Sequence, residues 1–221
     1  FKIKDEQIIS SAYLPQRDAV KHHRLPISEV FQIDASQLTT DKDLKVAFFD
    51  AGKIIEAFKQ FEYDSIQAEI EFVENDEDCV ASTFKIFNDE LEIVLACSEP
   101  SLGYKDLTES QLQNIFMTEG AEVNFDLSYT DTSKIKSLFN LDKDETFAIS
   151  TSKEGVRIKG KSYNKLINSA SVSKANVTVY KKYLNLFDKE DYSTYVFNNR
   201  VVLRSKDSNT LLTIATCQST D

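Results

Sequence analysis

Lysines on three short predicted helices are the side chains of this sequence best suited to bind a partner. Ammonium groups that share one surface attract polyanions, and they bind phosphates by releasing counterions. In any single helix the simpler interpretation is an ordinary solvated face. All three helices carry lysine on the exposed side, although the chain as a whole has a formal net charge of −10. We therefore interpret the three helices as sharing one basic surface. These lysines are Lys53, Lys59, Lys134, Lys136, Lys181 and Lys182.

The apolar residues predict how these helices are oriented. Helices are expected at 51–61, 132–141 and 181–188, where apolar residues recur three or four positions apart and therefore face a sheet. The lysines then lie on or beside the opposite face. The inward residues are Ile54, Phe58 and Phe61, then Ile135, Leu138 and Phe139, then Tyr183, Leu186 and Phe187.

The sequence repeats a βαβββ unit, which predicts an α+β fold made of two tandem domains. LEIVLAC at 91–97 matches LLTIATC at 211–217, and earlier strands match in the same order. A hairpin opens each unit, at 1–13 and 147–163. The predicted domains are 1–97 and 123–221, with a connector at 98–122. Strands are expected at 1–4, 7–13, 27–34, 44–49, 67–74, 80–87, 91–97, 123–129, 146–152, 155–162, 172–180, 192–198, 200–206 and 210–217.

The two halves differ at their starts. A strand and a helix at 123–141 precede the second hairpin, whereas no counterpart precedes Phe1 in this sequence. We expect that an N-terminal strand or segment and a helix of similar length once stood before Phe1.

The connector at 98–122 interrupts the β pattern. Thr108 opens a short predicted helix that reaches Met117, and Gln111 has the spacing of a capping box. The apolar residues of the connector most simply pack on the domains, and docking of a partner is the alternative. They are Leu102, Tyr104, Leu107, Leu112, Ile115 and Phe116.

Other reactive side chains lack the spacing of a known active site. His22 and His23 are predicted to lie in an exposed loop, and the acidic run 71–78 to form a solvated hairpin turn rather than a cation site. Phosphate-binding, nucleophile-elbow and zinc-hydrolase motifs are missing, so we expect no enzyme, no cofactor and no metal.

The three cysteines, Cys79, Cys97 and Cys217, have no CxxC spacing and are predicted to be small buried or half-buried residues in a reducing cytoplasm. No apolar run is long enough to span a bilayer.

The order of these elements resembles the DNA sliding clamps, and most of all the T4-type bacteriophage clamp. The resemblance is clearest in VNFDLSY, TSKIKSLFNL, TSKEGVRIKGKSYNK and VTVYKKYLNLFDKEDY of the second half, and in FFDAGKIIEAFKQF of the first. It covers nearly the whole chain as a pattern, because clamps share no invariant short motif. The clamp pattern also has a helix that this sequence lacks before Phe1.

The resemblance implies a homotrimeric ring with antiparallel sheets outside and helices lining the hole. The six lysines would then contact phosphates of double-stranded DNA without reading its sequence. A DNA polymerase, a clamp loader and RNA polymerase-associated factors of late transcription would bind the outer face. Leu102, Tyr104 and Leu107 are the residues expected in a pocket for partner peptides. Edge strands pairing between subunits would close the ring, in the host cytoplasm if the protein is viral.

Two other interpretations remain open from the sequence. The chain could be a duplicated β-rich protein-binding or virion structural module, in which the lysines only keep the helices soluble. It could also be an enzyme with an acidic site at 71–78. A trimer in solution would favour the clamp over both.

Overall fold

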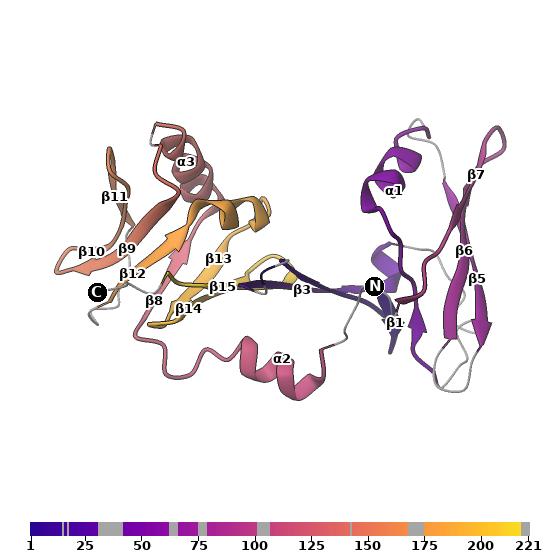
Figure 1. Ribbon diagram of the computed structural model, residues 1–221, viewed down its shortest axis with the longest axis horizontal. Helices are drawn as coiled ribbons and strands as arrows, with labels where there is room; N and C mark the ends of the chain where they lie inside the picture. The colour runs from indigo at the N-terminus through magenta and orange to yellow at the C-terminus, as the bar shows by residue number, and fades with distance from the viewer. Residues whose placement is uncertain are drawn as a thin grey trace. The chain divides into compact units, whose positions relative to one another are not determined.

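The computed structural model describes residues 1–14, 16, 18–30, 42–61, 66–74, 79–100, 107–141, 143–167 and 175–217. The chain forms two compact units (Figure 1). Unit 1 comprises residues 1–10 and 24–106, and unit 2 comprises residues 11–23 and 107–221. Two neighbouring strands, β2 (Gln7–Tyr13) and β3 (Ala19–Pro26), begin in one unit and end in the other. Residues 11–23 therefore belong to the compact unit formed by the second half of the chain.

Unit 1 is built on a mainly antiparallel sheet. Strand β6 (Cys79–Phe87) pairs along its length with β5 (Gln67–Glu74), and it also pairs with β7 (Glu92–Ala96) and with the short β4 (Leu44–Lys45). Strand β1 (Lys2–Lys4) lies between β4 and β2. Helix α1 (Ala51–Phe58) covers this sheet, with Ala57 and the following Phe61 packed on Phe84 and Ile86.

Unit 2 contains two sheets. The first runs β3, β15 (Asn209–Ala215), β14 (Arg200–Ser205), β13 (Tyr192–Val196), β8 (Val123–Leu127). The second runs β11 (Asn164–Ile167), β10 (Gly155–Lys159), β9 (Thr146–Ser152), β12 (Asn176–Tyr180). Helix α3 (Tyr129–Phe139) and the 3-10 helix η4 (Lys181–Leu186) share one core with both sheets.

The start of α3 is fixed by its own sequence. The Ser128 hydroxyl accepts a hydrogen bond from the Asp131 amide at 3.0 Å, which satisfies a donor that the first turn would leave open. Ile135 and Phe139 then point into the core, as their spacing predicts. This geometry leaves Lys134 on the exposed face of the helix.

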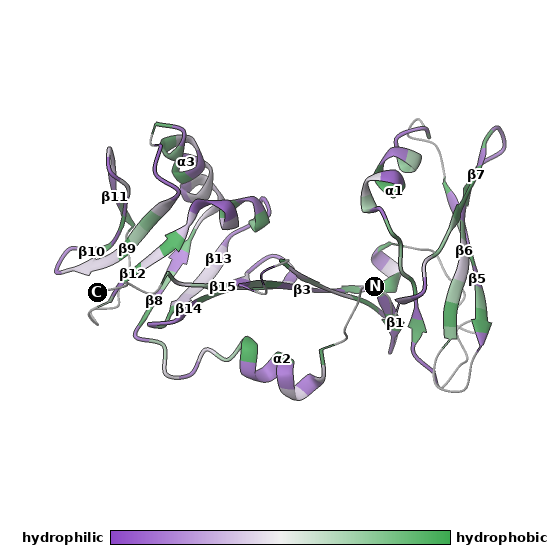
Figure 2. Ribbon diagram, in the orientation of Figure 1, coloured by the Kyte–Doolittle hydropathy of each residue, from purple (hydrophilic) through white to green (hydrophobic). Residues whose placement is uncertain are grey.

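The connector helix α2 (Glu109–Ile115) packs on the first sheet of unit 2, on the face opposite α3 and η4. Its capping box forms as predicted between Thr108 and Gln111. Leu112 and Phe116 are buried against Val20 and Val202. Figure 2 shows hydrophilic and hydrophobic residues within this one helix, which agrees with one exposed and one buried face. The packing expected for the connector is thus confirmed for its second half.

Several sequence predictions need correction. The strand predicted at 27–34 is wrong over its described residues, since β3 ends at Pro26 and Ile27–Glu29 forms the 3-10 helix η1, while 31–34 lie outside the described residues. The predicted strand at 44–49 is only Leu44–Lys45, and the predicted helix at 181–188 is a 3-10 helix. Strand β11 was missed because its polar residues obscure the alternation. Residues 172–174 of one predicted strand lie outside the described part of the chain.

The α+β repeat is present, but the last strands of its two halves correspond one residue away from the alignment of their sequences. Ile93 and Leu95 of β7 face the helix side of unit 1, and Leu212 and Ile214 of β15 face the helix side of unit 2. The letter match LEIVLAC to LLTIATC instead places Leu212 on Glu92. Because side chains alternate between faces, a one-residue shift reverses every side chain, so burial gives the correct equivalence.

Candidate nucleic-acid interface

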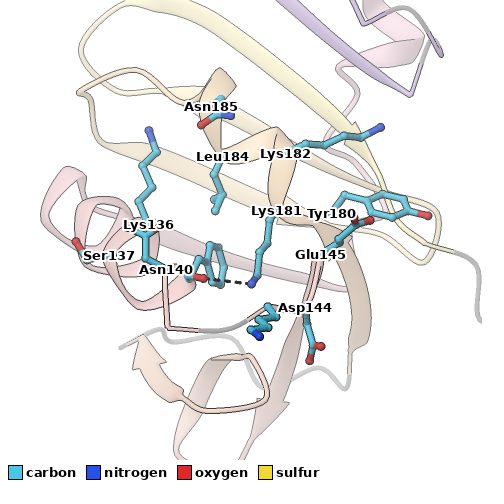
Figure 3. Close-up of a pocket in the computed structure, with 12 residues that line it drawn as sticks. Lys136, Ser137, Asn140, Asp144, Glu145, Tyr180, Lys181, Lys182, Leu184 and Asn185 are labelled. Carbon is cyan, nitrogen blue, oxygen red and sulfur yellow. Dashed lines mark hydrogen bonds between the residues drawn. The ribbon is translucent and has the colours of Figure 1, made fainter.

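A groove between α3 and η4 gathers most of the cationic side chains that the sequence singles out in unit 2. The groove has a volume of about 670 Å³ and is open to solvent (Figure 3). Lys136, Lys181 and Lys182 line it, as the lysine pattern predicts, and Lys143 adds a fourth ammonium group. Asn140 and Asn185 supply neutral amides, while Asp144 and Glu145 lie at the same groove. The groove is therefore cationic overall but not purely so.

Two of these lysines hold α3 and η4 together. Lys136 of α3 donates to the carbonyl oxygen of Phe187, just beyond η4, at 3.2 Å. Lys181 of η4 donates to the carbonyl oxygen of Phe139 at 3.2 Å, the bond marked by the dashed line in Figure 3. Phe139 ends α3, where the carbonyl end of the helix dipole favours a cation. Both lysines are half-buried, so they have a structural role in addition to their charge.

Lys182 carries a charge that is already paired. Its Nζ donates to Asp18 Oδ2 at 2.7 Å and to Gln16 Oε1 at 2.6 Å. The Tyr183 hydroxyl donates to the same Asp18 oxygen at 2.7 Å. Burial alone would raise the pKa of the Asp18 carboxyl, but these hydrogen bonds and the Lys182 charge outweigh it and lower that pKa. Sequence reasoning missed this pairing because Asp18 and Lys182 lie far apart in the chain.

Lys134 lies on the other side of α3. It is exposed and lines a second open groove of about 670 Å³ with Lys165, Tyr129, Leu138 and Leu141. Lys165 itself pairs with Asp131 at 2.7 Å. Of the predicted lysines in unit 2, Lys134 is the one on the fully exposed face of α3.

Lys53 and Lys59 belong to unit 1. Both are exposed, Lys53 in the first turn of α1 and Lys59 immediately after its last residue. Asp50 caps the helix by accepting from the Gly52 amide at 2.8 Å. The predicted outward positions of both lysines on α1 agree with their exposure.

The two histidines are not in an exposed loop, contrary to the sequence prediction. Both lie on β3, where His22 is buried with its Nδ1 2.8 Å from Ser11 Oγ. His23 Nδ1 lies 2.5 Å from Thr210 Oγ1 of β15. The charged and polar residues of this segment concealed a strand that pairs with β15, and the ring of Phe116 lies against His22 on one of its faces.

Other candidate sites show ordinary structural contacts. All three cysteines are half-buried free thiols, and burial raises the pKa of the Cys97 thiol. Glu71 accepts from Thr83 and Glu74 pairs with Lys42, while 75–78 lie outside the described residues. Within the described ranges, no cluster of three His, Cys, Asp or Glu residues has a metal-binding arrangement. No helix among these residues has the length and apolarity needed to cross a membrane.

The expected partner-peptide pocket is only partly within the described structure. Leu107 packs partly buried against the cluster under α2, whereas Leu102 and Tyr104 lie outside the described residues. Arg204 and Thr213 hold the end of α2 by donating to the carbonyl oxygens of Phe116 and Ile115, at 3.1 Å each.

Comparison with solved structures identifies the fold as that of sliding clamps. The PCNA of A. fulgidus, solved with the C-terminal region of FEN-1, matches with a TM-score of 0.66 and 16% identity, over 100% of this chain and 89% of that one. The PCNA of Thermococcus kodakaraensis matches with a TM-score of 0.64 and 13% identity, over 98% and 89%. A putative DNA polymerase III beta subunit of Eubacterium rectale matches with a TM-score of 0.64 and 9% identity, over 99% of this chain and 56% of that one. No protein-family model and no curated protein sequence matches the chain.

Proposed function

We propose that this chain is the subunit of a sliding clamp that encircles duplex DNA and tethers a DNA polymerase for processive synthesis. The observation that carries the proposal is the combination of a sliding-clamp fold with a cationic groove on the helix side of unit 2. The role is mechanical, so it requires no catalytic group. The tandem domains would be 1–97 and 123–221, joined by the connector.

The lysines would act on DNA through charge alone. Ammonium groups that contact phosphates bind duplex of any sequence, and their contribution falls as salt rises. A topological link keeps a clamp on DNA, so weak contacts suffice and movement along the duplex remains fast. We assign this contact to Lys53, Lys59, Lys134, Lys136, Lys181 and Lys182, and we add Lys143 from the groove.

Ring formation would join three copies of the chain through open strand edges. An unpaired edge exposes backbone donors and acceptors, and pairing with another copy satisfies them. When the same head-to-tail contact repeats between copies, the copies form a closed ring if the rotation that relates neighbouring copies allows closure.

The proposed partners bind the outside of this ring. The A. fulgidus PCNA structure contains the C-terminal region of FEN-1, which shows that a protein of this fold binds a partner's terminal segment. We propose the same mode here for a DNA polymerase and a clamp loader, with Leu102, Tyr104 and Leu107 in the pocket. Binding of RNA polymerase-associated factors during late transcription, and a bacteriophage origin, belong to the same proposal.

Charge reversal tests the proposal directly. Lys134, Lys136, Lys181 and Lys182 changed together to Glu should abolish stimulation of a replicative polymerase on primed circular DNA while sparing self-association. Because Lys136 and Lys181 also bond to backbone carbonyls, the exposed pair Lys134→Glu and Lys143→Glu is the cleaner variant. Lys153→Glu, at an exposed position that lines neither groove, is the control with the same sign of charge change. Unchanged processivity in both lysine variants would favour the duplicated binding module.

A further inference from the structure

The 3-10 helix η4 carries two of the lysines assigned to DNA, but little of its stability is local. It spans Lys181–Leu186, and 3-10 helices of more than about four residues are uncommon because their hydrogen bonds have poor geometry. The side chain of its N-cap residue, Tyr180, forms no capping hydrogen bond. Buried Tyr183 and Leu184 attach its inner side to the core of unit 2. The position of its two ends must therefore depend on neighbouring elements.

Two residues near the tip of the β2–β3 hairpin contact the two ends of η4. In the first turn, Asp18 accepts hydrogen bonds at 2.7 Å from Lys182 Nζ and from the Tyr183 hydroxyl. After the last turn, Lys21 Nζ donates to Asp188 Oδ1 at 2.6 Å. A 3-10 helix of this length rises about 12 Å and three residues of extended chain span about 10 Å, so the spacing of Asp18 and Lys21 matches η4. The hairpin thus holds η4 at both ends.

The segment that Lys21 contacts is itself fixed by other contacts. The backbone amide of Asp188 donates to the hydroxyl of Tyr192 at 2.9 Å, and the buried Tyr192 ring lies 5.6 Å from that of Phe187 between centroids. The Lys21 side chain is 24% exposed, so the ion pair is partly shielded from solvent. A pair between groups that are already ordered loses less side-chain entropy than one between two mobile side chains.

The same segment supports the cationic groove. Phe187, next to Asp188, provides the carbonyl oxygen to which Lys136 of α3 donates at 3.2 Å. Lys136 lines the groove and is labelled in Figure 3. A shift of this segment would therefore move the acceptor that orients Lys136. Neither Lys21 nor Asp188 is among the described residues that line the groove, so both would act on it indirectly.

We propose that Lys21 is a positioning residue for the DNA contact, which through Asp188 holds η4 and the acceptor of Lys136 in place. This inference rests on the proposed clamp function and adds to it a residue that acts without touching DNA. The two holds on η4 then have different roles. A phosphate that binds Lys182 takes it from Asp18, and of the two ion pairs described between the hairpin and the η4 segment only that of Lys21 remains.

Duplex binding by charge variants tests this role. Lys21→Met and Asp188→Ala should each weaken affinity by about twofold to tenfold, measured by fluorescence anisotropy with a labelled duplex. Asp188→Ala is the decisive variant, because loss of a negative charge would by itself strengthen the binding of a polyanion. The reciprocal variant, Lys21→Asp with Asp188→Lys, should restore affinity, since it keeps the ion pair with its charges exchanged. Lys153→Met and Glu119→Ala, at exposed positions that line neither groove, are the controls.

Amide hydrogen exchange provides a second measurement, without DNA. The amides of Phe187 and Asp188 donate to the Leu184 carbonyl and the Tyr192 hydroxyl. Both should exchange faster in Lys21→Met than in the wild type, and the reciprocal variant should restore the slower exchange. Unchanged exchange in strand β14, within the first sheet of unit 2, would show that the fold persists.

Stronger binding by Asp188→Ala, or a reciprocal variant as weak as the single variants, would overturn the positioning role. Unchanged exchange at Phe187 and Asp188 in Lys21→Met would overturn it as well. If exchange changes as expected but the wild type fails to bind duplex, the hold of Lys21 on η4 is supported and the clamp function is contradicted.

Discussion

Lys182 Nζ lies 2.7 Å from Asp18 Oδ2, in an ion pair that fixes the first turn of η4 to the turn between β2 and β3. The chain thus neutralises one of the lysines that its sequence presents as a phosphate contact. Lysines on one helix surface are therefore not equivalent, because their partners determine how much charge remains for DNA.

Replacing Asp18 with Asn should strengthen the binding of duplex DNA. The change removes a negative charge beside the groove and keeps the side-chain size, so Lys182 becomes available to a phosphate. We expect a gain of about twofold to threefold in affinity, the size of one surface ion pair. Fluorescence anisotropy with a labelled duplex of mixed sequence measures the effect. Glu119→Gln is the control, and an equal gain there would show that only net charge matters.

Lys134→Ala and Lys182→Ala should differ in their effect on the salt dependence of DNA binding. Each lost phosphate contact should reduce the slope of log affinity against log salt by about 0.9. Lys134 is exposed, so its removal should show this full reduction, whereas removal of the paired Lys182 should show less. Titrations at several salt concentrations measure both slopes. A larger reduction for Lys182 than for Lys134 would contradict the assignment.

Phe116→Ala should release the connector helix from the sheet. Phe116 is buried in the cluster with Leu112, Val20 and Val202, and its ring centroid lies 6.0 Å from that of His22. Truncating a buried Phe costs about 3 to 5 kcal/mol in the free energy of unfolding. Urea unfolding measures this loss, and proteolysis should cut the connector faster. Gln113→Ala, on the exposed face of α2, is the control and should leave both measurements unchanged.

Acid should weaken unit 2 partly through Asp131. Burial would raise the pKa of its carboxyl, but hydrogen bonds from Lys165 and Ser128 and the Lys165 charge outweigh burial and hold that pKa below its usual value of 3.8. A carboxyl with a lowered pKa in the folded state adds stability above its unfolded pKa. This stability is lost as the pH falls through the folded pKa.

The Asp131→Asn variant checks this dependence. The variant should be less stable than the wild type at neutral pH, and the difference should shrink as the pH falls below about 3.8. Urea unfolding across this range gives the comparison, with Asp144→Asn at an exposed position as the control. A difference that stays constant with pH would show that the Asp131 carboxylate is not the stabilising group.

Local patterns predicted much of this fold. The capping residues of α2, the strands at 7–13, 67–74 and 146–152, and the inward face of α3 all follow from periodicity and turn residues within a few positions. The inward face of α1 was predicted only in part, because Phe61 is buried as expected whereas Phe58 is 37% exposed and Ala57 is the buried residue within the helix. The outward positions of Lys53 and Lys134 could also be predicted from the spacing of the apolar residues in their helices.

Long-range contacts could not be read from the sequence. Strand β3 contains His22 and His23 and was missed because its pairing with β15 joins residues from opposite ends of the chain. The ion pair of Lys182 with Asp18 and the bonds of Lys136 and Lys181 to backbone carbonyls depend on the same packing. The sequence gives the number of charged residues in the chain. The tertiary structure determines which of those charges are paired within the protein and which remain available to a ligand.

Retention on circular DNA tests most directly whether this chain encircles duplex. Copies of the chain are cross-linked to one another with glutaraldehyde in the presence of a nicked circular plasmid. The mixture is then passed through a sizing column in salt that screens phosphate contacts. The account predicts that protein stays with the circle and is released after a single cut makes the plasmid linear. Equal loss from circular and linear plasmid, or retention that survives the cut, would contradict it.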